Sequence, residues 1–587
     1  MSSHRPGFSI ASVWYYFCCS DINYPAVAKL YLSKYSCVLK KSKGRLLLKI
    51  IVWTISVVAL LVILGLVLVN YCFIPHLKER ISAKIYESSE GVYELNIDSL
   101  DANIFSGNIM VINIHLVTDE SKRTSSHKKL LPRISLKAQA ISINDIQWVH
   151  YLFSKHLRIG KIELKNPVLS YQDYKKGKEK DHKTAAEKLP SLLSSFCKSL
   201  RIHELLLEGG MLDFKENSEK GITRHEINKI TITLNGVHVV SSSDKPLYAD
   251  QLTFSIKDYK VLFPLYSSNL HIHTIHGSTK DQNLILNGVS FESRPKHISH
   301  DIPQYRINIH SVKIHKVNYR KLLHLKEVNI HKCELHKVKM DIYENSNLPP
   351  LKEKKPFPYQ IFHELIPVAF NIDTLSVRNS NFLYRVILPE ANEPIEVAFS
   401  GTQIKITDLS NHKHSKQITK IYGNCDLFGS VPLEVHMEID LNDQNINFQY
   451  YGELKEMNLE VLNPIITKTT PAEIKRGTIH TGSFNFTVTN GTTNGTLSAN
   501  YENLKIELKS PVTGRKLRLL NTLSNQRIIN KSKENTIKNV QYTHQEKNES
   551  FFLFLVRPII AGAVKIVLKG VENKKVVEKI THPKSKK

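Results

Sequence analysis

The most regular feature of this chain is an alternation of apolar and polar residues in LRIHELLLEGGMLDF, Leu200–Phe214. Its apolar residues form two short runs, one on each side of the glycine pair Gly209–Gly210. A period of two is typical of strands with one buried face, and paired glycines are typical of tight turns. The stretch therefore predicts a β-hairpin.

Two other segments repeat this pattern. LRIGKIELKNPVLSY (Leu157–Tyr171) has Asn166–Pro167 in place of the glycines, and FNIDTLSVRNSNFLY (Phe370–Tyr384) has Asn379–Ser380. Weaker copies begin at Ile307 and Val328. The shared apolar positions are expected to lie largely on one face of a repeated sheet. They are Ile162, Leu164, Leu169, Tyr171, Leu205, Leu207, Leu212, Phe214, Leu375, Val377, Phe382 and Tyr384.

Neighbouring copies start at similar intervals. The step from Leu157 to Leu200 is about 43 residues, and the step from Val328 to Phe370 is about 42, within the range of repeat architectures. Each of the three best copies also follows a segment whose apolar residues have helical spacing. These predicted helices are Asp145–Lys155, Leu189–Ser199 and Pro358–Val368. The chain is therefore predicted to contain repeated helix-plus-hairpin units.

Most of the chain up to about Leu508 also alternates. A hairpin is predicted in Tyr93–Val117, with its turn at Ser106–Gly107. Further strands are predicted at Ile134–Ile143, Ile227–Val240, Leu252–Ile256, Leu284–Phe291, Val397–Ile406, Val431–Ile439, Ile446–Leu454 and Thr478–Val488. Asn-Gly dipeptides, which favour hairpin turns, occur at 235–236, 287–288, 490–491 and 494–495. These turns predict an antiparallel sheet.

The segment Ile50–Pro75 contains no charged residue, and it is long enough to cross the roughly 30 Å of a bilayer's hydrocarbon as a helix. It is too long and too far from Met1 for a cleaved signal peptide. Lys and Arg precede it, and Glu79, Glu87, Glu90 and Glu94 follow it. The positive-inside rule therefore predicts an anchor with the rest of the chain outside the cytoplasm. A further helix is predicted directly after it, at 76–89.

A second apolar stretch, FFLFLVRPIIAGAVKIVL at Phe551–Leu568, is interrupted by Arg557, Pro558 and Lys565. These interruptions favour one or two amphipathic helices that lie on a membrane or cap the array, over a buried pair of strands. The Lys-rich tail Lys574–Lys587 that follows suits either an anionic surface or solvent.

Charge adds one further constraint. The chain of 587 residues has 80 Lys and Arg against 54 Asp and Glu, a formal net charge of +26. This excess favours an anionic partner, lipid headgroups or nucleic acid, although it also fits a Lys-, Ile- and Asn-rich composition without a specific partner. A location outside the cytoplasm argues against nucleic acid. The predicted organisation is a basic cytoplasmic segment (1–49), a transmembrane helix (50–74), a repeating β region (75–510) and a C-terminal region with amphipathic helices and a basic tail (511–587).

Catalytic and cofactor-binding motifs are absent from the sequence, which contains no phosphate-binding loop, dinucleotide fingerprint, nucleophile elbow or HExxH zinc motif. His271 and His273 have the spacing of two ligands on one strand face, but no third ligand is evident, and the same holds for His412 and His414. Hydrogen-bonded or solvent-facing rings are the simpler interpretation. The seven cysteines form neither a disulfide framework nor a CxxC site. We expect no enzyme, no metal and no cofactor.

The anchor, the phrase LNIDSLDANIFSGNIMVINIHL after it, the repeated units and GTLSANYENLKIEL (Gly495–Leu508) together resemble the AsmA-like family of Gram-negative envelope proteins, in its divergent Bacteroidetes-type form. The resemblance extends over about Ile50–Gly570. It is similar in layout to the wider repeating-β-groove class that includes TamB and the chorein-type lipid bridges. The family implies a mainly β fold, in which an inner-membrane helix is followed by an elongated antiparallel β-groove with short helices between strands.

The family also implies a function in lipid transfer or outer-membrane lipid homeostasis, with the shared apolar positions lining the groove. The lipid function is also physically reasonable, because an open sheet would expose more apolar surface than a soluble monomer tolerates. Either a second sheet or acyl chains must therefore cover the apolar face. The expected partners are membrane lipids, with anionic headgroups preferred, and an outer-membrane or envelope protein. The alternative function is a scaffold that assembles outer-membrane proteins by strand addition.

Overall fold

The computed structural model of this chain is mainly β. It divides into two compact units. The first contains Met1–Ile22, Lys41–Val289 and Lys313–Asn329, and the second contains Asn23–Lys40, Ser290–Val312 and Ile330–Lys587. The structure describes residues 8–9, 53, 77–103, 106–125, 132–173, 197–218, 221–240, 247–263, 268–293, 303–319, 327–345, 347–349, 358–359, 362–363, 369–387, 393–412, 417–469, 472–508, 531–532, 536–543 and 550–567.

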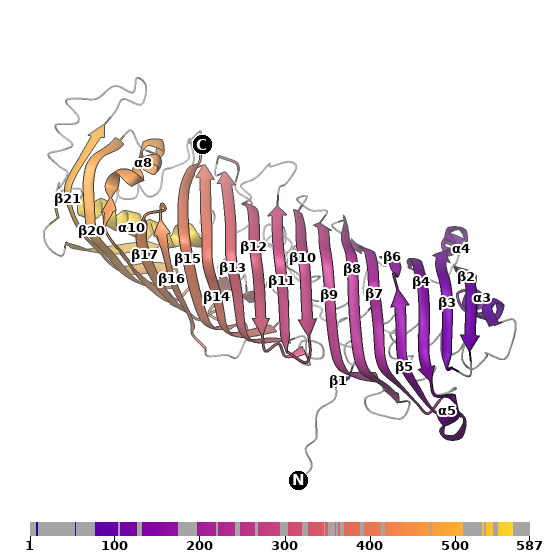
Figure 1. Ribbon diagram of the computed structural model, residues 1–587. Coiled ribbons are helices and arrows are strands. Elements are labelled where there is room, and N and C mark those ends of the chain that lie inside the picture. Colours follow the sequence, from indigo (N-terminus) through magenta and orange to yellow (C-terminus); the bar gives the residue numbers. More distant parts are fainter. Residues whose placement is uncertain are drawn as a thin grey trace, which may run out of the picture. The chain divides into compact units, whose positions relative to one another are not determined.

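The first unit is a sheet whose strands lie side by side in chain order, apart from the first, two-residue strand (Figure 1). They are β1 (Phe8–Ser9), β2 (Tyr93–Asn103), β3 (Asn108–Thr118), β4 (Arg133–Ile146), β5 (His156–Lys165), β6 (Val168–Asp173), β7 (Ser199–Ser218), β8 (Gly221–Val240), β9 (Leu247–Phe263) and β10 (Ser268–Ser278). Its helices are α3 (Leu77–Ser88), α4 (Glu120–Ser125) and α5 (Trp148–Ser154). The two-residue strand β1 pairs with β9. The residues of β11 (Asn283–Ser293) and β12 (Gln304–His315) are divided between the two units, and Glu327–Asn329, at the start of β13 (Glu327–Asn345), also belong to the first unit.

The second unit is also a sheet of long strands. They are β13 (Glu327–Asn345), β14 (Ala369–Ile387), β15 (Ile395–Ser410), β16 (Thr419–Leu427), β17 (Val431–Ile439), β18 (Phe448–Leu454), β19 (Met457–Asn458), β20 (Ala472–Thr489), β21 (Thr492–Leu508) and β22 (Ile537–Thr543). From β14 to β18 each strand pairs antiparallel with the next, and β18 and β19 both pair with β20. Its helical elements are η5 (Leu459–Leu462), α8 (Asn463–Thr469) and α10 (Phe551–Val567).

The prediction of three hairpins from the repeat is wrong, because each of these segments runs in one direction and does not turn back on itself. β7 runs without reversal through Gly209 and Gly210, and β14 runs through Asn379. β5 and β6 pair with successive parts of β7 in one direction, so Asn166–Pro167 interrupts a strand and does not reverse it. In both β7 and β14 the pairing register shifts at the expected turn, which is the signature of a β-bulge.

Parallel pairing is the second departure from expectation. β5 and β6 run parallel to β7, whereas the other pairs of the first unit are antiparallel, so the sheet is mixed. Contacts between β13 and β14 also join residues at a nearly constant offset, as in His331 with Asp373 and Val338 with Ser380. Because residue numbers rise together along both strands, β13 and β14 run in the same direction.

The Asn-Gly dipeptides have mixed outcomes. Asn490–Gly491 forms the turn between β20 and β21, as predicted. The other three dipeptides lie inside strands, at positions 235–236 of β8, 287–288 of β11 and 494–495 of β21. The turn predicted at Ser106–Gly107 is confirmed, because it joins β2 to β3. The eight further predicted strands, from Ile134 onward, are all present.

Two of the predicted helices lie within the described residues and are present. The helix predicted after the anchor is α3, and the one predicted at Asp145–Lys155 is the shorter α5. Most of Leu189–Ser199 and of Pro358–Val368 lies outside the described residues. The anchor segment Ile50–Pro75 also lies outside them except for Trp53, and none of the described helices is long and apolar enough to cross a membrane.

Candidate functional site

The predicted face residues of the first two copies lie together on one buried face of the first unit. Ile162 pairs with Leu205, Leu164 with Leu207, Leu169 with Leu212 and Tyr171 with Phe214. Seven of these eight side chains are buried, and Tyr171 is half-buried. The sequence equivalence between the copies is therefore also a spatial one, because equivalent residues are neighbours on adjacent strands.

An aromatic row crosses this face near one end of the strands. The rings of Tyr171 and Phe214 are stacked, with centroids 5.3 Å apart. Phe214 lies 5.8 Å from the His225 ring, which is stacked 6.2 Å from Tyr259. At the Tyr171 end of this series of rings, the ring centroid of Trp53 lies 4.6 Å from that of Tyr171. We call Tyr171, Phe214, His225 and Tyr259 the aromatic row.

His225 is the polar member of the aromatic row. Its side chain is only 1% exposed, and burial lowers its pKa to about 3. Its Nδ1 lies 3.1 Å from the hydroxyl of Tyr259, and its Nε2 has no hydrogen-bond partner among the described residues. The sequence pattern does not single out His225 as functional, although this residue has the same alternating phase as Ile227, the first residue of the predicted strand.

The third copy contributes to the apolar face of the second unit. Val377 and Tyr384 are buried there, whereas Leu375 and Phe382 are half-buried. Phe382 and Tyr384 of β14 pair with Phe399 and Val397 of β15. The ring of Phe552, from α10, lies 4.9 Å from that of Tyr384. This copy is therefore next to a helix near the C-terminus.

Helix α10 packs across several strands of the second unit, and Figure 1 shows it in yellow behind them. Phe448 of β18 packs against Phe554, and the hydroxyl of Tyr450 donates to the carbonyl oxygen of Leu555 at 3.1 Å. Near the far end, the Tyr501 hydroxyl of β21 donates to the carbonyl oxygen of Ile566 at 3.4 Å. The prediction of helix in this segment is confirmed as a single helix, and the alternative of two buried strands is wrong.

The contact between α10 and the sheet depends on small residues. A side-chain carbon at Gly562 would meet Leu497 at 2.8 Å and Val540 at 2.9 Å. The buried positions of the helix, from Phe554 through Pro558 and Ala561 to Ile566, form one stripe. The other side of the helix is also apolar: Ile560 is 44% exposed, and Ala563 is exposed as well. One apolar side therefore faces the sheet, while the opposite side remains partly open.

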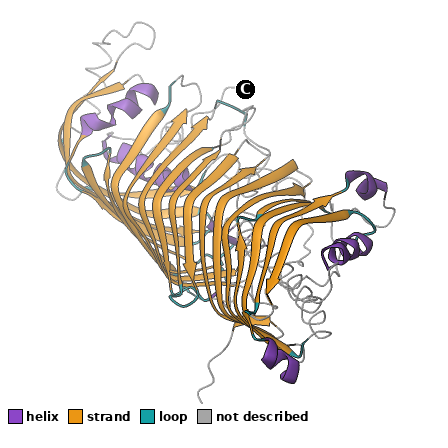
Figure 2. Cartoon of the chain, turned by 45° about the vertical axis from the view of Figure 1, so that its right-hand side comes forward, coloured by secondary structure: helices purple, strands orange, loops and turns teal. Residues whose placement is uncertain are grey.

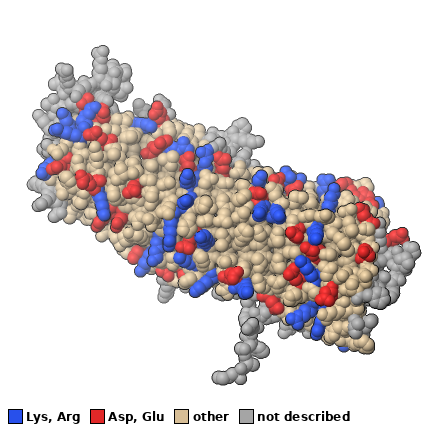
Figure 3. Space-filling model, viewed as in Figure 1, with Lys and Arg blue, Asp and Glu red and all other residues tan. Residues whose placement is uncertain are grey.

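The opposite, polar side of the strands carries interspersed charges, as the face in Figure 3 shows. Cross-strand ion pairs there include Lys161 with Glu204 at 3.0 Å and Arg224 with Asp213 at 3.0 Å. His271 and His273 both approach Asp258, at 3.5 and 3.0 Å, and the hydrogen bond from His273 lowers the pKa of that carboxyl. Among the described residues, no cluster of His, Cys, Asp and Glu could hold a metal ion.

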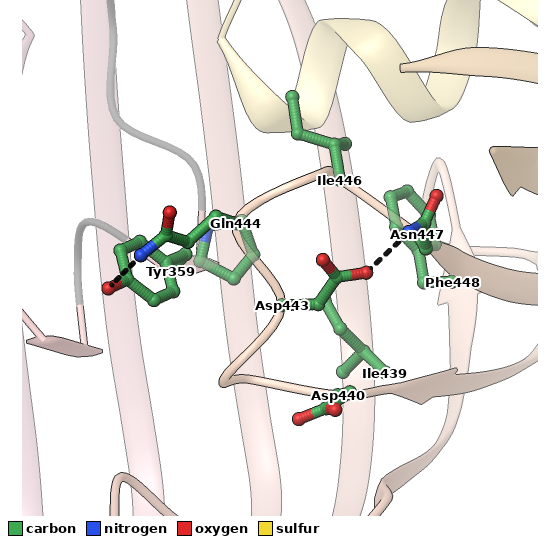
Figure 4. A pocket seen from close by; sticks show the side chains of 9 residues that line it. Tyr359, Ile439, Asp440, Asp443, Gln444, Ile446, Asn447 and Phe448 are labelled. Carbon is green, nitrogen blue, oxygen red and sulfur yellow. Dashed lines mark hydrogen bonds between the residues drawn. The ribbon is translucent and has the colours of Figure 1, made fainter. Parts of the chain in front are cut away.

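A small pocket lies beside the loop between β17 and β18 (Figure 4). Its polar groups are already paired, because Gln444 donates to the Tyr359 hydroxyl at 2.8 Å and Asn447 donates to Asp443 at 2.6 Å. Phe448 lines the same pocket and connects it to the packing of α10. These bonds hold the loop in place, so the pocket is better explained as structure than as a polar binding site.

The candidate binding surfaces are therefore mainly apolar. The first unit has a buried sheet face with a histidine in its aromatic row, and the second unit has a buried sheet face under an apolar helix. Such surfaces can hold hydrocarbon, either side chains or acyl chains. No model of a known protein family matches this chain. No curated protein matches it significantly either.

Proposed function

We propose that this protein is a membrane-anchored, AsmA-like lipid-binding protein that accommodates acyl chains against its apolar sheet faces. The observation that carries the proposal is the aligned apolar face of β5 to β7, where Leu164 pairs with Leu207 and Leu169 with Leu212. Neighbouring strands with their apolar residues in one register make a continuous hydrocarbon surface, which suits a long flexible chain better than a compact ligand.

The packing of α10 supports the same function. The helix is apolar over nearly its whole circumference, yet it packs on the sheet through one stripe that includes Phe554 and Gly562. An apolar helix and a bundle of acyl chains satisfy a sheet face by the same hydrophobic effect, which is not directional. The second unit therefore has a face that requires an apolar cover, and in this structure α10 forms at least part of that cover.

We further propose that Ile50–Pro75 anchors the protein in the inner membrane, with the N-terminus in the cytoplasm and most of the chain in the periplasm. The basic residues before the segment support this orientation. The net charge of +26 suits a partner with anionic headgroups. In this location the protein would contribute to lipid transfer or outer-membrane lipid homeostasis.

The test is to purify the full chain in mild detergent and to identify bound lipid by mass spectrometry. Phe382→Glu places a charge on the apolar face of the second unit. The position is half-buried, so the carboxylate keeps some access to water. Phe153→Glu is the matched control, because that side chain is 89% exposed on α5. We expect bound lipid in the wild type and in the control, and a large loss in Phe382→Glu. Absence of lipid from the wild type would refute the proposal.

A further inference from the structure

His225 interrupts an otherwise apolar line of side chains across the first unit. In register, Tyr171 of β6 is next to Phe214 of β7, Phe214 is opposite His225 of β8, and His225 is opposite Val261 of β9. Tyr259 lies on the same face, two residues from Val261. A polar ring buried among these neighbours needs its hydrogen bonds satisfied, since an unsatisfied buried group costs about 1–3 kcal/mol.

The hydrogen-bond partners indicate which imidazole nitrogen carries the proton. The contact between Nδ1 of His225 and the Tyr259 hydroxyl can form in either direction. If Nδ1 donated, both the Tyr259 proton and the Nε2 lone pair would be unsatisfied. If the Tyr259 hydroxyl donates to Nδ1, only the Nε2 N–H is left without a partner, in agreement with the part of the chain that the structure describes, where Nε2 has none. The second arrangement leaves fewer groups unsatisfied, so Nε2 is a hydrogen-bond donor.

We propose that Nε2 of His225 binds the ester carbonyl oxygen of an acyl lipid lying along the aromatic row. This inference rests on the proposed function, because it requires lipid on this face. It adds one position at which a directional hydrogen bond, as well as hydrophobic burial, holds the lipid. The rings of Phe214 and Tyr171 would contact the adjoining hydrocarbon, while the N–H donates to the ester.

Ester oxygen fits this position better than headgroup phosphate. A buried phosphate would need a cationic partner, and His225 is neutral at ordinary pH because burial lowers its pKa. The adjacent Arg224 is on the polar side of β8, where it pairs with Asp213 and Glu226. A neutral donor beside apolar rings matches a neutral acceptor at the head of a hydrocarbon chain.

The test compares two probes on the full chain in detergent: a diester phosphatidylglycerol and its diether analogue, which lacks both carbonyl oxygens. We expect the wild type to bind the diester about tenfold more tightly, the value of one net hydrogen bond. His225→Phe should bind both probes equally. His225→Gln, which keeps an N–H donor, should retain part of the preference.

His238→Phe is the matched control, because His238 is also on β8 but stacks on Tyr248, outside the aromatic row. It should keep the wild-type preference. Equal binding of both probes by the wild type, or an unchanged preference in His225→Phe, would overturn this inference and leave the proposed function intact. Failure of the wild type to bind either probe would overturn both.

Discussion

Residues with left-handed backbone conformation mark the places where the long strands change register. Asn166, Gly209 and Asn379 all have φ between 46° and 70°. In β7 and β14 the pairing register shifts at these residues, and bulges of this kind bend a strand and increase its twist. Figure 2 shows long strands that bend along their length. We therefore expect these residues to contribute to the bending of their strands.

Gly209→Ala tests this role. At a φ of +70° an alanine side chain is strained, and its Cβ would overlap the Asn166 side chain on the neighbouring strand line. We expect a loss of about 1–3 kcal/mol in stability, measured as a lower midpoint of urea unfolding. Gly423→Ala is the control, because its Cβ would have no neighbour closer than 3.9 Å. Equal effects of the two changes would contradict the assignment.

His225 also predicts a pH dependence of stability. Its pKa is about 3 in the folded chain because burial disfavours the charged ring, and the ordinary value is 6.5. The unfolded chain therefore binds a proton first as pH falls, so stability is complete above about pH 6.5 and declines below it, by up to about 1.4 kcal/mol per pH unit.

The measurement is urea unfolding at pH 7 and at pH 5, for the wild type and for His225→Phe. We expect the wild type to lose about 2 kcal/mol more than the variant over this range. Tyr259, whose hydroxyl contacts His225, stays protonated throughout, since burial raises its pKa. Parallel declines in the two proteins would show that His225 is not buried as described.

At the scale of elements, the sequence pattern located strands well but could not say how they join. Leu157–Tyr171 and Leu200–Phe214 were correctly aligned, and the structure pairs them residue by residue in parallel. The hairpin prediction failed because a bulge and a tight turn both require left-handed residues such as Gly209. The two differ only in whether the neighbouring strand continues past that residue, and local sequence does not contain this information.

The packing of α10 illustrates the same limit. Its apolar composition predicts burial of some kind, but a helix that is apolar on nearly all sides does not indicate which stripe meets the sheet. Gly562 could have signalled a close approach, because helices usually avoid glycine unless backbone or side chains come near. His225 is a comparable case. Its position in the alternation predicts the buried face, whereas histidine as a residue type is only intermediate in its tendency to be buried.

Gly562→Val tests the close approach of α10. The new side chain would collide with Leu497 and Val540, so the helix must move off the sheet, at a cost of about 1–3 kcal/mol. Ala563→Val changes the neighbouring, exposed position and should have little effect. Helix propensity alone predicts the opposite order, because valine is a better helix former than glycine and a poorer one than alanine. Melting temperature and limited proteolysis near residue 550 would distinguish the two outcomes.

For the whole molecule, the proposed function depends on where the N-terminal apolar segment lies. Trp53 contacts Tyr171 at the end of the aromatic row, and Phe8–Ser9 pair with β9. The sequence instead predicts that Ile50–Pro75 crosses a membrane. A segment inside a bilayer would not cover Tyr171. The two arrangements therefore differ in whether this end of the row is free to meet lipid.

Reporter fusions distinguish these arrangements. Eight basic residues precede Ile50, with Asp21 as the single acidic residue there. We therefore expect a reporter after Lys587 to be active only outside the cytoplasm and one at Ser42 only inside it. Changing the basic residues nearest the segment (Lys40, Lys41, Lys43, Arg45 and Lys49) to glutamine should yield mixed orientation, since these charges set it. If both reporters were instead active on the same side, the segment would not cross the membrane, Trp53 would remain on Tyr171, and lipid could reach the row only by displacing it.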